Sequence, residues 1–256
     1  MNPDERDTHA YSFGAAAAAY DEHRPDYPET AVRWALELAP GHRVLDLAAG
    51  TGKLTRVLAS LGLDVIAVEP DEQMLAELQS NLPSVTALSG QAEDIPLLNS
   101  SVDAVVAGQA MHWFDMEQAG PEIARVLVPQ GTIGAMWNFD DDRVPWVAAL
   151  EEAAEDTGGA TMSQWLSGDH ESHFVTPSLP GLFGELERAE FPHGQLRTAA
   201  SLTATIATHS RLLMMEPGDR ERVLSAVRVF LESHPETSAG EFTMPMVTAA
   251  FRAVRL

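Results

Sequence analysis

The sequence of 256 residues contains no cysteine, and it has few basic side chains. The absence of thiols excludes disulfides, thiolate metal ligands and a cysteine nucleophile. Lysine and arginine together number 16 against 38 aspartates and glutamates, which gives a formal net charge of −22. Because nucleic acids and anionic membranes are bound by clustered cations, this charge balance argues against either of them as a partner.

Long apolar runs are also missing, although 45% of the residues are hydrophobic. No apolar segment approaches the ~20 residues that a membrane-spanning helix needs. The first thirty residues contain no positively charged start followed by an apolar core, so a secretory signal is not expected. Composition and length therefore predict a cytoplasmic α/β protein built as one large domain, with or without a small lid.

The most informative stretch runs VLDLAAGTGKLT, from Val44 to Thr55. An apolar run with one carboxylate, Asp46, is followed by small residues and then by a helical pattern. This order predicts a buried parallel strand, a tight turn and the start of a helix. Ligands of open α/β sheets bind at the carboxyl ends of the strands. Asp46 is therefore well placed to bind a cationic or hydroxylated group.

Two phosphate-binding motifs do not fit this turn. A P-loop requires G-x-x-x-x-G-K-[ST], but Leu47 stands at the first glycine position and Leu54 follows the lysine. The dinucleotide fingerprint G-x-G-x-x-G fits Gly50 and Gly52 but meets Thr55 at the third glycine position. These departures disfavour a nucleoside triphosphate or a nicotinamide cofactor.

The stretch instead resembles the first motif of the class I S-adenosylmethionine-dependent methyltransferases, (V/L)-L-D-x-G-x-G-x-G. Ala48 replaces the first glycine of that motif, which leaves the turn more crowded. The resemblance implies that S-adenosyl-L-methionine binds at the turn, with S-adenosyl-L-homocysteine as the product. Cofactor contacts are then expected from Asp46, Ala48, Gly50, Thr51 and Gly52. For this stretch taken alone, the alternative is a strand, turn and helix that bind no ligand.

The second predicted strand, 64–68, ends at Glu69. A carboxylate there is able to accept hydrogen bonds from both hydroxyls of a ribose, and the family carries an acidic residue at this place. The resemblance places Pro70 and Met74 beside the adenine. A polarizable thioether suits that contact, but Met74 fits a helix core equally well.

Further motifs follow the third and fourth predicted strands, 85–88 and 102–107. GQAEDIPL over 90–97 resembles the family's G-x-A-E-x-(I/L)-P-(F/L), which implies that Gln91, Ala92 and Glu93 lie at the adenine. GQAMHWF over 108–114 leaves the edge that faces the methyl group in this fold, so cofactor contact is expected from Gln109 and acceptor contact from His112 and Trp113. We predict His112 as the catalytic residue, acting as a base or an orienting group, because its ordinary pKa lies near neutrality. A purely structural histidine is the alternative.

The N-terminal pattern from Phe13 through Tyr20 to RPDYP at 24–28 resembles the cap of one small-molecule methyltransferase subgroup. The resemblance implies that Tyr20, Arg24 and Tyr27 lie near the cofactor entrance and contact the substrate. Simple packing of these aromatic residues on the sheet is the alternative.

Motifs become sparse in the second half of the chain. EIARVLVPQG over 122–131 resembles the family's E-x-x-R-V-L-x-P-G-G, with Gln130 at a turn glycine, and a fifth strand is predicted over 132–137. Beyond it we expect a helix near 144–157, a lid or substrate loop over 158–182, a strand over 186–197, helices over 201–213 and 219–233, and a last strand over 243–254. His170 and His173 have the spacing of metal ligands, but no further signature supports a metal site, and none is predicted.

The resemblance implies a doubly wound sheet of seven strands in the order 3-2-1-4-5-7-6, with only the last strand antiparallel and with helices and loops covering the substrate. The expected parts of the single domain, 13–256, are a cap over 13–40, a cofactor-binding core over 41–139, a lid over 140–182 and C-terminal elements over 183–256.

The expected activity is in-line methyl transfer to a small molecule or a short peptide. A hydroxyl or a protonated nitrogen as acceptor needs a base, whereas a carboxylate does not. The fold also permits a non-methylating reaction such as cyclisation, or a binder without catalysis.

Overall fold

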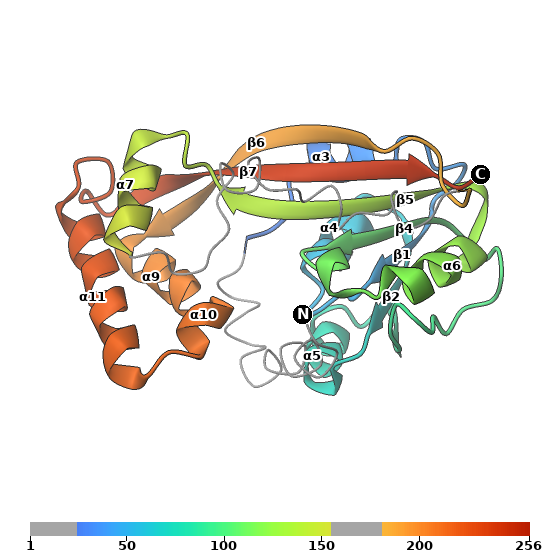
Figure 1. The fold of residues 1–256 in the computed structure, drawn as a ribbon, viewed down its shortest axis with the longest axis horizontal. Coiled ribbons are helices and arrows are strands. Elements are labelled where there is room, and N and C mark those ends of the chain that lie inside the picture. Colours follow the sequence, from blue (N-terminus) through green and yellow to red (C-terminus); the bar gives the residue numbers. More distant parts are fainter. Residues whose placement is uncertain (1–24, 155–180) are drawn as a thin grey trace.

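A seven-stranded sheet crosses the whole length of the molecule (Figure 1). The computed structural model describes residues 25–154 and 181–256. The strands are β1 Arg43–Leu47, β2 Asp64–Glu69, β3 Thr86–Ser89, β4 Val102–Gly108, β5 Leu127–Asp140, β6 Glu187–Thr198 and β7 Glu241–Val254. Their order is β3-β2-β1-β4-β5-β7-β6. β7 is antiparallel to both of its neighbours, and the other strand pairs are parallel. The predicted order and the single antiparallel strand are confirmed.

Helices connect these strands and begin at recognisable local signals. They are α3 Glu29–Leu36, α4 Lys53–Ser60, α5 Glu72–Asn81, the 3₁₀ helix η2 Met111–Trp113, α6 Met116–Val126, α7 Pro145–Ala153, α9 Ala199–Ala207, α10 Ser210–Leu213 and α11 Pro217–Ser233. The Asp71 side chain caps α5 by accepting from the N–H groups of Gln73 and Met74. Thr198 and Ser201 form a reciprocal capping box at the start of α9.

Successive residues of the central strands are buried on opposite faces of the sheet. Val44 packs in the cluster that contains Ala35 of α3 and Leu58 of α4. Its neighbour Leu45 packs in the cluster that contains Ile123 of α6. A strand that is buried on both faces needs a mainly apolar sequence, which is why β1, β2 and β4 are largely hydrophobic, with Asp46 as the buried exception in β1.

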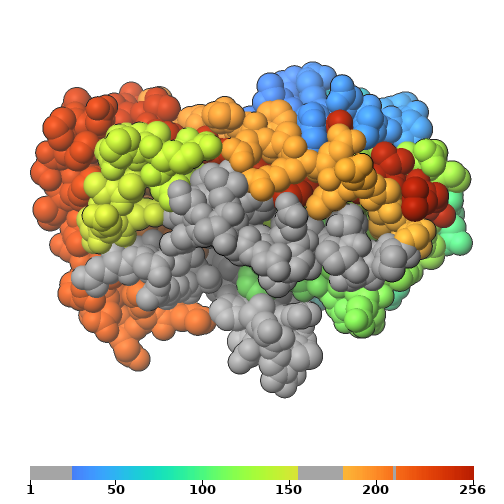
Figure 2. Space-filling model, turned by 45° about the horizontal axis from the view of Figure 1, so that its top comes forward, coloured from blue at the N-terminus to red at the C-terminus, as the bar shows by residue number. Residues whose placement is uncertain are grey.

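A third cluster lies at the opposite end of the molecule from α6 (Figure 1), and we call it the helical cluster. It joins α7, α9, α10 and α11 to the first residues of β7. β7 pairs with β5 only from Met246 onward, so its residues 241–245 extend past β5 with β6 as their strand partner. The surface view shows α7 and α11 at this end, while β6 lies along the exposed sheet edge beside α3 (Figure 2).

One detail of this half differs from the sequence expectation. β5 is longer than the predicted strand 132–137, because Leu127 already pairs with Val102 and residues 138–140 pair with β7. The described part of the expected lid, 140–154, contributes α7 to the helical cluster, together with helices from 199–233. Residues 155–180 lie outside the described part of the chain. No helix among the described residues is both long and apolar enough to cross a membrane.

Candidate functional site

The turn after β1 is built from residues with left-handed backbone angles. Ala48 and Gly50 both have φ of 57°, and Gly52 has φ of 92°. The Ala49 N–H donates to the carbonyl of Val68 at 3.1 Å, which ties the turn to β2. A residue with a β-carbon loses roughly 1–2 kcal/mol in this region. Ala48 therefore occupies a position that favours the glycine of the family motif.

Asp46 and Thr51 place polar atoms with unmet hydrogen-bonding capacity at this turn. The Asp46 side chain is only 1% exposed, and its Oδ2 accepts from Thr55 Oγ1 at 2.5 Å. Asp46 Oδ1 and Thr51 Oγ1 are buried without a hydrogen-bond partner among the described residues. Burial raises the pKa of Asp46 to about 7, the Thr55 hydrogen bond opposes this rise, and the charge of Glu69 adds to it. A cationic ligand group would satisfy both the unpaired oxygen and the buried charge.

Glu69, at the end of β2, binds the same turn from the other side. Its Oε2 accepts from the Gly50 N–H at 2.8 Å, and its Oε1 accepts from the Asp71 N–H at 2.9 Å. Burial raises the pKa of Glu69 to about 7 against these two hydrogen bonds. Each carboxylate oxygen retains a second lone pair, so it can still accept a hydrogen bond from a hydroxyl group of a ligand. The cap at Asp71 also places Met74 close to the turn, since a β-carbon on Gly50 would lie 3.9 Å from its Sδ.

A pocket opens between the turn, the end of β4 and the segment 25–27. Its described lining is Pro25, Tyr27, Asp46, Ala48, Ala49, Gly50, Thr51, Lys53, Leu54, Gly108, Gln109 and Asn138. Six of these were predicted as site residues, namely Tyr27, Asp46, Ala48, Gly50, Thr51 and Gln109. The pocket thus brings together side chains from four separate regions of the sequence.

Sequence reasoning missed six residues of this lining, namely Pro25, Ala49, Lys53, Leu54, Gly108 and Asn138, of which Asn138 is the most informative. It directly follows the predicted fifth strand, so the rule that ligands bind at carboxyl strand ends pointed to it. Pro25 belongs to the N-terminal cap pattern without having been selected. Lys53 and Leu54 were considered only in the comparison with the P-loop motif.

Tyr27 and Gln109 both line the pocket, next to Gly108. Tyr27 is 8% exposed, and its ring covers Gly108 so closely that a β-carbon on Gly108 would lie 2.5 Å from Tyr27 Oη. Gln109 has φ of 56°, and its Nε2 donates to the Asn138 carbonyl at 3.0 Å. Glycine at position 108 is therefore needed for the close approach of the tyrosine.

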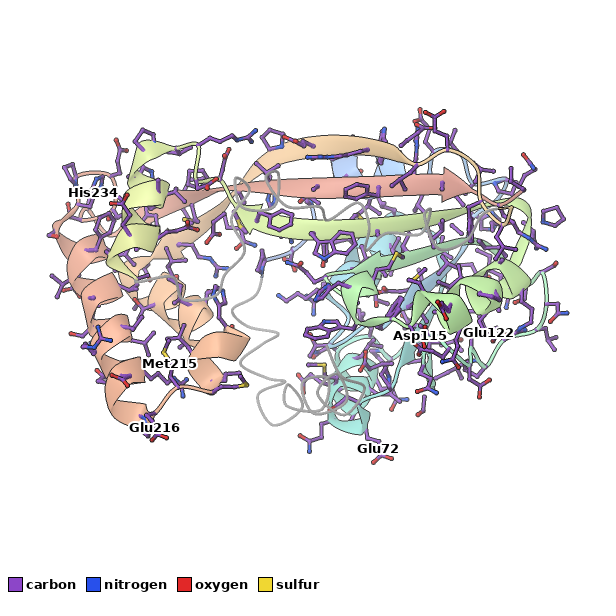
Figure 3. All side chains as sticks on the ribbon, viewed as in Figure 1. Glu72, Asp115, Glu122, Met215, Glu216 and His234 are labelled. Atoms are coloured by element: carbon purple, nitrogen blue, oxygen red, sulfur yellow. The ribbon has the colours of Figure 1, made fainter. Side chains whose placement is uncertain are left out.

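The segment predicted to contact adenine lies beside α6. Ala92 is buried, and Gln91 is exposed and forms a bridge with Asp94. Glu93 Oε1 accepts from the N–H of Asp115, the residue that caps α6 (Figure 3). None of the six predicted residues Glu69, Pro70, Met74, Gln91, Ala92 and Glu93 is in the described lining of the pocket. They border the turn and α6 instead, as does Gly52, which precedes α4.

His112 lies on η2 and is exposed, next to Trp113, with ring centroids 4.5 Å apart. The Nε1–H of Trp137 donates to His112 Nδ1 at 3.3 Å. Because an indole nitrogen only donates, this bond assigns the lone pair to Nδ1 and the proton of the neutral imidazole to Nε2. Sequence reasoning missed Trp137, although it is the last residue of the predicted fifth strand.

The E-x-x-R-V-L motif is a structural tie. Arg125 donates to the carbonyls of Ile95 and Leu97 at 2.9 and 2.7 Å, and it forms an ion pair with Glu122 at 2.7 Å. Glu122, on α6 (Figure 3), also accepts from the Ile95 N–H at 3.1 Å. The motif therefore fixes the backbone that follows Glu93 rather than binding a ligand.

Four residues of the sequence analysis, Tyr20, Arg24, His170 and His173, lie outside the described residues. Within 25–154 and 181–256, no group of three or more histidine, aspartate or glutamate side chains is arranged to hold a metal ion.

Known proteins are similar to this chain in both sequence and fold. The family described as "Methyltransferase domain" matches residues 45–134. An uncharacterized methyltransferase of Mycobacterium tuberculosis is 40% identical over 94% of this chain and 95% of its own length. A malonyl-[acyl-carrier protein] O-methyltransferase of Pectobacterium atrosepticum is 33% identical over 48% of this chain and 50% of its own.

A solved structure assigned as a type II methyltransferase, from Anaeromyxobacter dehalogenans, superposes with a TM-score of 0.65 at 26% identity. The superposition covers 91% of this chain and 97% of that chain. The order of the seven strands agrees with this solved structure. The chain belongs to the class I S-adenosylmethionine-dependent methyltransferases.

Proposed function

We propose that this protein transfers a methyl group from S-adenosylmethionine to a small molecule or a short peptide by in-line displacement. The observation that carries the proposal is the pair of buried polar atoms, Asp46 Oδ1 and Thr51 Oγ1, without partners among the described residues at the pocket. These atoms would hold the cationic amino-acid end of the cofactor. When bound, the cofactor supplies an electrophilic methyl carbon.

The remaining cofactor contacts are assigned to residues around the turn. Glu69 would accept from the ribose hydroxyls, with Gly50 and Gly52 leaving room for close backbone approach. Ala48 and Gln109 complete the wall of the pocket. The adenine side is assigned to Pro70, Met74, Gln91, Ala92 and Glu93.

Removal of the Glu69 carboxylate tests this assignment. Glu69→Ala should weaken binding of S-adenosylhomocysteine by about 1.5–3 kcal/mol, the range for hydrogen bonds to a charged group. Glu77→Ala is the matched control, because Glu77 on α5 is bonded to the exposed Asn81 amide away from the pocket. Calorimetry that finds equal affinity in the folded Glu69→Ala protein and in the control would remove Glu69 from the site.

We assign His112 the catalytic role at the acceptor, with Tyr20, Arg24, Tyr27 and Trp113 as substrate contacts. With Trp137 donating to Nδ1, the group that His112 offers to a substrate is the Nε2–H donor. A donor aligns and polarises an acceptor oxygen, whereas a base would have to receive a proton. This arrangement favours an acceptor that is already nucleophilic at neutral pH, and a carboxylate is the first class to test.

Two further observations bear on the class of acceptor. The relative from Pectobacterium atrosepticum is by its name an O-methyltransferase of a malonyl group. The net charge of −22 also disfavours nucleic acid, whose tight and salt-sensitive retention on the protein would contradict the proposal. A cytoplasmic location remains a prediction from composition.

Labelled cofactor and a panel of carboxylic acids, alcohols and amines provide the test. Single-turnover transfer to a carboxylate should slow only a few-fold in His112→Ala, and less in His112→Gln, which keeps an N–H donor, whereas a fall of about 10²-fold or more would indicate general-base catalysis and a protonated acceptor. Transfer at the parent rate in His112→Ala would make the residue structural. Binding of the cofactor without methyl release to any acceptor would favour a binder or a non-methylating enzyme.

A further inference from the structure

Three side chains form a buried polar chain across β6, β7 and β5. His193 Nε2 lies 3.1 Å from Thr248 Oγ1, and Thr248 Oγ1 donates to Asn138 Oδ1 at 2.5 Å. Asn138 Nδ2 then donates to the backbone carbonyl of Asp26 at 3.3 Å. Thr248 is 0% exposed and Asn138 is also buried, so each missing bond would leave a buried polar atom unpaired.

The direction of every bond in this chain is determined by its two ends. The carbonyl of Asp26 only accepts, so the amide nitrogen of Asn138 must face it. The amide oxygen of Asn138 therefore faces Thr248, whose single hydroxyl proton is used in that bond. His193 must then act as the donor from Nε2. Burial lowers the pKa of His193, which favours the neutral ring, and the required tautomer carries its proton on Nε2.

Asn138 thereby connects two walls of the cofactor pocket, whose lining it also joins. Its side chain holds the Asp26 carbonyl, which lies between the lining residues Pro25 and Tyr27. Its own backbone carbonyl accepts from Gln109 Nε2 at 3.0 Å on the other wall. The segment 25–27 has a second attachment, an ion pair of 3.3 Å between the Asp26 carboxylate and Nζ of Lys53, which also lines the pocket.

We propose that Asn138 is a positioning residue of the cofactor site, and that Thr248 and His193 fix its amide so that the segment 25–27 stays closed over the pocket. Without the Thr248 hydroxyl the amide oxygen loses its donor, and rotation of the amide would turn that oxygen toward the Asp26 carbonyl. The segment would then open more often, and the bound cofactor would leave faster. The proposal concerns retention of the cofactor and is independent of the acceptor and of the role of His112.

Thr248→Val is the decisive variant, because valine keeps the shape of threonine and removes the hydroxyl. We expect binding of S-adenosylhomocysteine to weaken about 3- to 10-fold, the equivalent of one net hydrogen bond, mainly through faster dissociation. Thr248→Ser should restore the affinity. The matched control is Thr132→Val on β5, because Thr132 Oγ1 is equally buried and has no hydrogen-bond partner among the described residues.

Hydrogen exchange separates positioning from general destabilisation. In the complex with S-adenosylhomocysteine, Thr248→Val should raise exchange in the peptide that covers 25–32 and leave α11 unchanged. Wild-type affinity and exchange in Thr248→Val would overturn the proposal, and so would an equal loss in Thr248→Ser or in Thr132→Val. If Thr248→Val does not fold, Asn138→Asp replaces it, since the aspartate still accepts from Thr248 but opposes the Asp26 carbonyl. Wild-type affinity in that variant would also overturn the proposal.

Discussion

Two buried carboxyls, that of Asp46 in the pocket and that of Glu69 beside the turn, should make the stability of the cofactor-free protein fall as pH rises. Burial raises the pKa values of Asp46 and Glu69 to about 7, from ordinary values of 3.8 and 4.5. Between these limits the folded state holds protons that the unfolded chain has released. Stability therefore decreases with pH across this window, by roughly 1.4 kcal/mol per pH unit for each retained proton.

The expected size follows from the difference between the folded and unfolded values. For Asp46 the difference of about three pKa units corresponds to roughly 4 kcal/mol once the carboxyl is fully ionised. Asp46→Asn keeps an oxygen that accepts from Thr55 but carries no charge. We expect the stability of the variant relative to that of the wild type to rise by about 2–3 kcal/mol between pH 5 and pH 8.

Urea denaturation of wild type and variant at intervals from pH 5 to pH 8 measures this difference. The comparison between the two proteins matters, because burial lowers the pKa of His193 and gives that residue the opposite slope. Asp103→Asn is the control, since Asp103 accepts from the Arg43 N–H at the amino end of β1, away from the pocket. Parallel pH curves for wild type and Asp46→Asn would refute the reasoning.

The same carboxyl links cofactor binding to protons. A cationic group beside Asp46 stabilises the ionised form, so binding near pH 6 should release protons. Calorimetry in buffers of different ionisation enthalpy would detect this release in the wild type and a smaller release in Asp46→Asn. Equal proton release in the two proteins would indicate that Asp46 does not face the charged end of the cofactor.

Three further predictions concern left-handed backbone angles, the close contact at Gly108 and the hydrogen bonds of Arg125. Ala48→Gly and Gln130→Gly, at φ of 57° and 64°, should each raise the free energy of unfolding by about 1 kcal/mol, measured by urea denaturation. Gly108→Ala should displace Tyr27 and weaken S-adenosylhomocysteine binding by about 1–3 kcal/mol, measured by calorimetry, whereas unchanged affinity would mean that the ring moves without consequence. Arg125→Ala should lower the unfolding midpoint through loss of about 1.5–3 kcal/mol, and unaltered stability would contradict its role as a tie.

The turn after β1 and the positions of the central strands could be predicted because they depend on local rules, whereas the strand order was implied by the resemblance to the methyltransferase family. Largely apolar runs identify strands buried on both faces, and small residues after Asp46 identify a turn at a strand end. The same rule of strand ends pointed toward Asn138 and Trp137, which lie at the end of the predicted fifth strand. These two residues were missed because asparagine and tryptophan there matched no family motif.

The helical cluster was harder to predict because its cause is tertiary. Neither α7 nor α9 shows which surface it buries, and both are ordered by the first residues of β7, nearly a hundred residues further along from α7. The polar chain of His193, Thr248 and Asn138 has the same origin. It exists because β6 and β5 both pair with β7, and a sequence pattern gives no signal for a contact made across three strands.

Several features that break local rules lie at the turn after β1 and at the pocket, and their position has a physical meaning. Ala48 and Gln109 adopt left-handed angles without being glycine, while Asp46 and Glu69 bury carboxyls that ionise only near pH 7. Each feature destabilises the protein in the absence of a ligand, and each lies where a cationic, hydroxylated ligand would relieve or use it. The continuous apolar packing on both faces of the central strands offsets this loss. Without a ligand, the cofactor site is therefore less stable than the sheet that supports it. Ligand binding lowers its free energy.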